Sequence, residues 1–102
     1  MTTKRLPFPH PGEIIKEEYL VPMNISQYKL AEKTGMPHSR VTALIHGRVG
    51  ITADTAIRLA KYFDTDPISW MNLQNEYDIR MADAKKHKDY KDISPAPELA
   101  HC

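Results

Sequence analysis

The stretch "ISQYKLAEKTGMPHSRVTALIHG", residues 25–47, predicts two short helices joined by a sharp turn. Ser26 suits the N-cap of the first helix, and Gly35 suits the left-handed residue at which such a helix ends. The second helix follows at once and is expected to end at Gly47. These two helices decide the fold, because the remaining segments must pack around them.

Small and apolar residues recur across the two helices at the spacing of a helix-turn-helix. Ala31 is small enough to let the helices cross closely, Met36 fills the corner, and Val41 and Leu44 seat the second helix on a core. In this motif the second helix lies in the DNA major groove, and its N-terminal residues reach the base edges. A plain helical hairpin without DNA binding is the alternative.

Polar residues on the outer side of this pair are predicted to contact DNA. Gln27, at the start of the first helix, is expected to meet a phosphate. Arg40 suits either a guanine or a phosphate, and Ala43 suits a thymine methyl group. The full predicted set is Gln27, His38, Ser39, Arg40, Thr42, Ala43, His46 and Arg48.

The distribution of charge along the chain agrees with a polyanionic partner. The net charge is only +1, but residues 33–53 contain Lys33, Arg40 and Arg48 and no acidic residue. A local basic surface matters more for binding a polyanion than the total charge does. Chance, together with an ordinary solvated face, is the other explanation.

Three more helices are predicted outside this pair, and no strand. The first helix begins at Pro11 and is expected to stop at Pro22. A fourth begins after Thr52, and a fifth begins after Asp66 and runs to about Lys86. The prediction is therefore an all-α, five-helix, lambda-repressor-like DNA-binding domain, with the helix-turn-helix at helices two and three.

A chain of 102 residues, 41% of them hydrophobic, is long enough for one domain with one modest core. We expect residues 1–82 to form the DNA-binding and dimerisation domain. The sequence after residue 82 becomes polar and includes two prolines, so residues 83–102 are expected to form a flexible tail.

The segment "SQYKLAEKTGMPHSRVTALIHG" resembles the Cro/repressor-type (XRE) helix-turn-helix family. The flanking segments "HPGEIIKEEYL", "RVGITADTAIRLAKYF" and "ISWMNLQNEYD" narrow the resemblance to the HigA/VapI group of antitoxins over about residues 9–80. This resemblance implies a homodimer that represses its own operon. It also implies neutralisation of a HigB-type toxin, a small ribosome-dependent enzyme that cleaves mRNA.

Apolar residues of the fifth helix suggest where two copies of the chain would meet. Trp70, Leu73 and Tyr77 recur at helical spacing. They either close the core of the monomer or form a self-association face, and we favour the second. Two-fold pairing would place two recognition helices one DNA turn, about 34 Å, apart.

A toxin is expected to bind away from the recognition helix, because that helix cannot hold DNA and toxin at once. The N-terminal arm offers Leu6 and Phe8 beside prolines, an extended shape that suits docking on a partner. The first helix offers Glu13 and Glu17, and a toxin that acts on RNA should be basic. Alternatively, these glutamates belong to an ordinary solvent-exposed helix face that binds no partner.

Other functional classes find little support in the sequence. The five histidines show no helical metal-ligand spacing, and the chain has one cysteine, Cys102. No phosphate loop, activated serine or metalloprotease motif is present, so neither an enzyme nor a cofactor is expected. No apolar run approaches a membrane span, and no secretory signal is visible, so a cytoplasmic location is expected.

Two competing functions stay open at this point. One is a stand-alone XRE-family transcriptional regulator without a toxin partner. The other is a protein-interaction module that has lost DNA binding.

Overall fold

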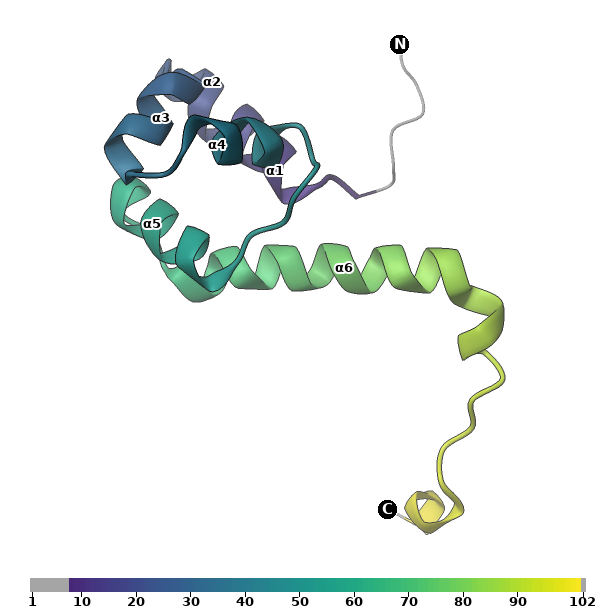
Figure 1. Ribbon diagram of the computed structural model, residues 1–102. Helices are drawn as coiled ribbons and strands as arrows, with labels where there is room; N and C mark the ends of the chain where they lie inside the picture. Colours follow the sequence, from purple (N-terminus) through teal and green to yellow (C-terminus); the bar gives the residue numbers. More distant parts are fainter. Residues whose placement is uncertain (1–7, 102) are drawn as a thin grey trace.

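The computed structural model describes residues 8–101, and every regular element within that range is helical (Figure 1). In chain order the elements are α1 (Pro11–Ile15), the π-helical η1 (Lys16–Leu20), α2 (Val21–Met23), α3 (Gln27–Thr34), α4 (His38–Ile45), α5 (Ala53–Phe63), α6 (Pro67–Tyr90) and the 3-10 helix η2 (Pro97–His101). Since α1, η1 and α2 follow one another without a break, they form the first of the five predicted helices. The predicted all-α fold is confirmed.

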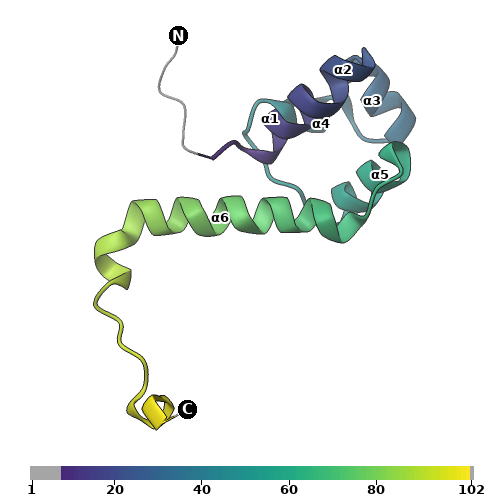
Figure 2. The ribbon, with the colours of Figure 1, turned by 180° about the vertical axis from the view of Figure 1, so that it is seen from behind.

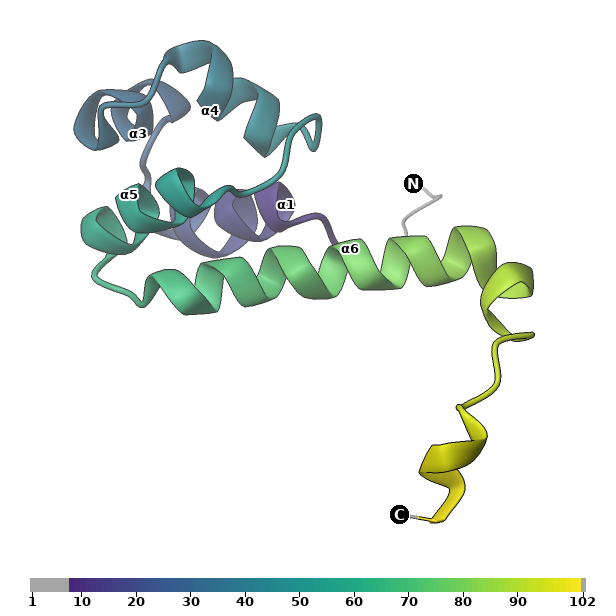
Figure 3. The same cartoon turned by 60° about the horizontal axis from the view of Figure 1, so that its bottom comes forward.

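The helices pack in layers that leave α4 on the outside. In Figure 3, α3 and α4 lie on one side, α1 and α5 lie in the middle, and α6 runs along the other side. Pairs in contact include α3 with α4, α1 with α4, and α5 with α6. Figure 2 shows that α6 continues past the other helices before the chain turns away.

Local capping signals set most helix starts and ends, as the sequence predicts. Ser26 Oγ accepts a hydrogen bond from the Lys29 N–H at 3.0 Å, and Asp66 caps α6 through the Ile68 N–H at 3.0 Å. Thr52 caps α5 in the same way. Gly35 ends α3 with a φ of 72°, a value that glycine adopts without steric cost.

Pro22 does not stop the first helix, so that prediction is wrong. The Val21 N–H donates to the Lys16 carbonyl, five residues earlier, which widens the helix into a π-helical turn. A proline within regular α-helix clashes with the carbonyl four residues before it, and the wider turn accommodates the ring. The helix ends instead at Asn24, whose φ is 56°.

The last long helix extends further than predicted. α6 reaches Tyr90, but Lys86, near which the helix was expected to end, has non-helical φ and ψ values of −120° and 29°. Residues 91–99 are exposed. The predicted flexibility of residues 83–102 stays a prediction.

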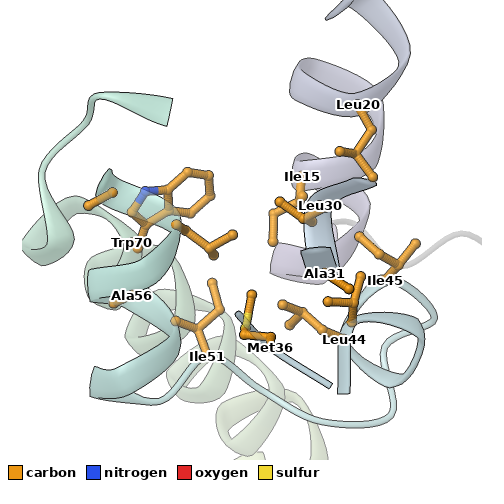
Figure 4. Close-up of a cluster of buried hydrophobic side chains, with 13 residues drawn as sticks. Ile15, Leu20, Leu30, Ala31, Met36, Leu44, Ile45, Ile51, Ala56 and Trp70 are labelled. Carbon is orange, nitrogen blue, oxygen red and sulfur yellow. The ribbon is translucent and has the colours of Figure 1, made fainter. Parts of the chain in front are cut away.

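A single apolar core lies between the helices (Figure 4). Its members are Ile15, Leu20, Leu30, Ala31, Met36, Val41, Leu44, Ile45, Ile51, Ala56, Leu59, Ala60 and Trp70. Met36 fills the corner between α3 and α4, as predicted. Burial of each large aliphatic side chain contributes about 1.5–3 kcal/mol, so α4 is held mainly by its inner face.

Gly12 brings the backbones of α1 and α4 into direct contact. A Cβ atom on Gly12 would overlap the Leu44 carbonyl oxygen, and it would lie 2.8 Å from the Leu44 carbonyl carbon and 3.1 Å from Ile45 Cα. Backbone atoms cannot move aside as a flexible side chain can. Gly12 is therefore required by the close approach of the two helices.

We predict that Gly12→Ala lowers the free energy of unfolding by about 3 kcal/mol, because α1 must separate from α4 to admit the methyl group. Urea denaturation of the full chain measures the change. Ser69→Ala, at an exposed position of α6, is the control and should change stability by less than about 0.5 kcal/mol. Equal stability of the Gly12 and Ser69 variants would contradict the prediction.

Candidate nucleic-acid interface

The turn between α3 and α4 has the geometry of a helix-turn-helix. The N–H groups of Gly35 and Met36 both donate to the Ala31 carbonyl, at 3.0 and 3.1 Å. Arg58 of α5 donates through Nη1 to the Thr34 carbonyl at 2.8 Å, which satisfies another acceptor at the end of α3. Both helices are thus fixed at the corner from which α4 begins.

The predicted DNA contacts lie together on the outer side of this pair. Exposed members are His38, Ser39, His46 and Arg48, and partly exposed members are Gln27, Arg40, Thr42 and Ala43. The opposite face of α4 is buried through Val41, Leu44 and Ile45. A helix with one face in the core and a polar outer face without acidic residues can be presented to a nucleic acid.

Arg40 is joined to α5 by an ion pair that spacing along the sequence did not reveal. Its Nη1 donates to Asp54 Oδ2 at 2.9 Å and lies 3.4 Å from Thr55 Oγ1. Arg58 Nε donates to the same Asp54 oxygen, also at 2.9 Å. The Arg40 hydrogen bond, followed by that of Arg58, holds the pKa of the Asp54 carboxyl below its ordinary value.

This arrangement changes the electrostatics of the outer surface. The acid-free stretch of sequence ends just before Asp54, and folding brings that carboxylate back beside α4. Because the side chains of Arg40 and Asp54 are 37% and 55% exposed, water screens the ion pair and it holds only weakly. Arg40 can therefore exchange the carboxylate for a DNA phosphate.

Tyr28 is a further residue at this surface that the motif spacing did not predict. It is 64% exposed on α3, and its ring centroid lies 4.7 Å from that of His38. His38 Nε2 is also 3.7 Å from a carboxylate oxygen of Glu32. The only signal in the sequence was an aromatic residue directly after Gln27.

His46 has one ring nitrogen fixed by its own helix. Its Nδ1 lies 2.9 Å from the Thr42 carbonyl, which can only accept, so Nδ1 carries the proton. Nε2 of the neutral ring is then an acceptor on an exposed side chain. That atom is suited to an amino group on a base edge.

The residues predicted for a dimer interface are not on one open face. Trp70 is 2% exposed in the core, where its Nε1 donates to Thr65 Oγ1 at 2.7 Å. Leu73 and Tyr77 line a groove together with Phe8, Pro9, Ile14, Glu76 and Arg80. Trp70 thus closes the core, which was the other possibility for this helix.

Of the residues predicted to bind a toxin, Phe8 lines this groove. Phe8 packs against Tyr77 with ring centroids 5.8 Å apart, and the Arg80 guanidinium lies 5.9 Å from the Phe8 ring. Glu17 is exposed on η1, Glu13 is partly exposed on α1, and Leu6 lies outside the described residues. We call the surface lined by Phe8, Pro9, Ile14, Leu73, Glu76, Tyr77 and Arg80 the arm groove.

Residues 8–101 show no other obvious chemical centre. Across this range no three histidine, cysteine, aspartate or glutamate side chains cluster as metal ligands would. Among the helices described, none is both long and apolar enough to cross a membrane. The outer face of α4 and the arm groove are both accessible to a partner within the described residues.

Comparison with known proteins identifies relatives of this chain. Residues 15–70 match the helix-turn-helix family HTH_3. The chain is 47% identical over 81 residues to virulence-associated protein I of Dichelobacter nodosus, covering 79% of this chain and 75% of that protein. It is 37% identical over 93 residues to antitoxin HigA-1 of Vibrio cholerae, covering 91% and 87% of the two chains. The structure of Pseudomonas aeruginosa antitoxin HigA with the higBA promoter superposes with a TM-score of 0.81 at 41% identity, covering 85% of this chain and 96% of that one.

We predict opposite effects on DNA affinity from the two partners of the Arg40–Asp54 ion pair. Arg40→Ala should weaken binding evenly across DNA sequences and reduce the slope of log affinity against log salt by about 1, because one phosphate contact is lost. Asp54→Asn should strengthen binding, because it removes a negative charge beside α4 and releases Arg40. Mobility-shift titrations at several salt concentrations measure both.

Asp64→Asn is the matched control, since it removes a carboxylate from the far end of α5 and asparagine tolerates the left-handed φ of 55° at that position. Stronger binding by the Asp64 variant as well would attribute the gain to net charge. A loss of affinity in Asp54→Asn with the fold intact would mean that the pair itself positions Arg40.

Proposed function

The chain belongs to the helix-turn-helix family HTH_3 and, within it, to the HigA-type antitoxins, which are DNA-binding proteins and not enzymes, and from this premise we propose that it represses its own operon and neutralises a HigB-type toxin. The observation that carries the proposal is the outer face of α4, which lies in the same fold as a HigA antitoxin studied with its promoter. Both activities would take place in the cytoplasm, where the operon and the toxin's mRNA substrates are found.

In the proposed DNA complex, α4 enters the major groove. Ser39 and Thr42 offer hydroxyl groups to base edges, and Ala43 offers a methyl group. Gln27 begins α3 and Arg48 follows α4, and both residues suit phosphates. Tyr28 is added to the predicted set, because an exposed ring beside the start of α4 can reach the sugar–phosphate backbone.

We propose that two copies associate through α6. Ile68 and Ile79 are 66% and 68% exposed and lie eleven residues, about three helical turns, apart on the same side of the helix. The predicted dimer face is largely occupied within the monomer, because Trp70 is enclosed in the core and Phe8 packs on Tyr77. The face that carries Ile68 and Ile79 therefore suits a second copy better. A two-fold dimer would present two α4 helices to one side of the DNA.

We propose that the toxin binds the arm groove and the adjoining surface of α1 and η1. The groove combines apolar lining from Phe8, Ile14 and Leu73 with the exposed carboxylate of Glu76. Glu17 adds an exposed carboxylate on the adjoining η1. Complementary charge would speed the capture of a basic toxin and make it sensitive to salt. Because the dimer is assigned to a different side of α6, one chain would be able to hold DNA, a second copy and the toxin together.

We predict that the chain protects two operator half-sites about 34 Å apart, with two chains on each operator. Replacing Ser39, Thr42 and Arg48 together by alanine should weaken binding about 100-fold or more, because base and phosphate contacts are lost. Footprinting and mobility shift on DNA from upstream of its own gene measure both outcomes.

Ser69→Ala/Lys88→Ala is the control, as it removes a hydroxyl and a cation from exposed positions of α6. It should bind like the unchanged protein. If the triple variant keeps full affinity while remaining folded, α4 is not the DNA-reading helix. A single protected half-site bound by one chain would count against the dimer.

We predict that Phe8→Ala/Glu17→Lys abolishes growth rescue when the chain is co-expressed with the neighbouring toxin gene, while operator binding is retained. The first change removes apolar lining from the arm groove, and the second places a like charge opposite a basic toxin. Point variants of the full chain are needed, because removal of residues 1–20 would also remove Ile15 from the core.

The matched control is Ile93→Ala/Glu98→Lys, which makes the same kinds of change at exposed residues of the C-terminal segment. Rescue by both double variants would exclude the arm groove as the toxin site. If the unchanged chain neither rescues growth nor binds the neighbouring product, the protein is instead a stand-alone regulator.

A further inference from the structure

Gln74 is a buried polar residue of α6 whose side chain reaches across to the chain beyond α4. It is 7% exposed, and its Oε1 accepts a hydrogen bond from the Ile51 N–H at 2.7 Å. Its Nε2 donates to Asp78 Oδ1 at 2.9 Å, one helical turn further along α6. Both ends of the amide are therefore satisfied, which fixes its orientation.

The residues that Gln74 reaches belong to the segment directly after α4, which we call the exit loop (residues 47–51). The exit loop is bonded back onto α4. The Gly47 N–H donates to the Leu44 carbonyl at 3.1 Å, and the Arg48 N–H donates to the Ala43 carbonyl at 2.8 Å. Any shift of the exit loop therefore moves Arg48 and the last turn of α4 with it.

Gly50 shows how closely the exit loop packs on the Gln74 amide. A Cβ atom on Gly50 would lie 2.8–2.9 Å from the three amide heavy atoms of Gln74. Ile51 is itself 4% exposed, so its N–H lies where water is largely excluded. A buried N–H without an acceptor is costly, and removal of Oε1 should force this part of the loop outward toward solvent.

A second contact holds the other side of the exit loop. The His10 ring lies against the exit loop, where it would be 3.6 Å from a Cβ atom on Gly47. The same ring packs on Tyr77 of α6 with centroids 4.9 Å apart. His10 Nδ1 already accepts from the Gly12 N–H at 2.9 Å, so His10 joins α1, α6 and the exit loop.

We propose that Gln74 is a positioning residue for DNA binding. It holds the exit loop, and with it Arg48 and the last turn of α4, in the position that contact with DNA requires. The proposal rests on the proposed binding of DNA by α4. Gln74 does not touch DNA, since it is buried on α6. It acts by supplying the one acceptor that holds Ile51 against the body of the protein.

A donor–acceptor exchange tests this role. Gln74→Met keeps a similar length but removes the acceptor. Gln74→Glu/Asp78→Asn restores both bonds with the roles at positions 74 and 78 exchanged, because the carboxylate accepts from the Ile51 N–H and from the asparagine amide. Asp78→Asn alone is the control, since its side-chain oxygen can still accept from Gln74.

We expect Gln74→Met to weaken operator binding about tenfold and to reduce the slope of log affinity against log salt by about 1, the loss of one phosphate contact at Arg48. The exchange variant and the Asp78→Asn control should bind within about twofold of the unchanged protein. Hydrogen exchange at the Ile51 amide should be fast in Gln74→Met and slow in the other three proteins. Urea denaturation gives the stability of each variant.

Three results would overturn the proposal. The first is that Gln74→Met binds DNA with unchanged affinity and an unchanged salt slope. The second is that the exchange variant protects the Ile51 amide but binds DNA as weakly as Gln74→Met does. The third is a slow Ile51 amide in Gln74→Met. If the unchanged protein binds no DNA, the proposed function fails, and the positioning role fails with it even where Ile51 exchange confirms the hydrogen bond.

Discussion

The contact between the backbones of α1 and α4 at Gly12 is the constraint on which the DNA-facing surface depends. No side chain separates the two helices there, so the back of α4 rests on atoms that cannot change rotamer. Protein interiors are close-packed, so a displacement at such a contact is transmitted to the neighbouring residues. The outer residues of α4 therefore keep a defined direction, which recognition of base edges requires. The exit loop adds support from the C-terminal end of α4.

The helix boundaries could be predicted from the sequence wherever the physical cause is local. Ser26, Thr52 and Asp66 cap helices through bonds to N–H groups two or three residues away, and Gly35 ends α3 through its own φ. Such signals lie within a few residues and are visible in the chain itself. Pro22 is the exception, because the π-helical turn that accommodates it depends on bonding across five residues.

Contacts between helices could not be predicted in this way. No spacing in the sequence pairs Asp54 with Arg40, fourteen residues earlier, yet the two side chains form an ion pair. Trp70 looked like a candidate for self-association, but Thr65 and the rings of Tyr19 and Phe63 enclose it within the monomer. The outer face of α4 was predictable because its buried positions recur at helical spacing along one helix. The arm groove was not, because it joins residues 8–14 to residues 73–80, far along the chain.

The π-helical turn η1 has a consequence for how the first helix tolerates insertions and deletions. Such a turn holds one residue more than regular α-helix would, so it amounts to a single-residue insertion. Deleting one residue from it would restore regular bonding, but it would rotate the preceding turns by about 100° relative to the rest. Gly12 would then no longer face Leu44, and Ile15 would leave the core. The fold thus constrains the length of this helix more strictly than the composition of its exposed side.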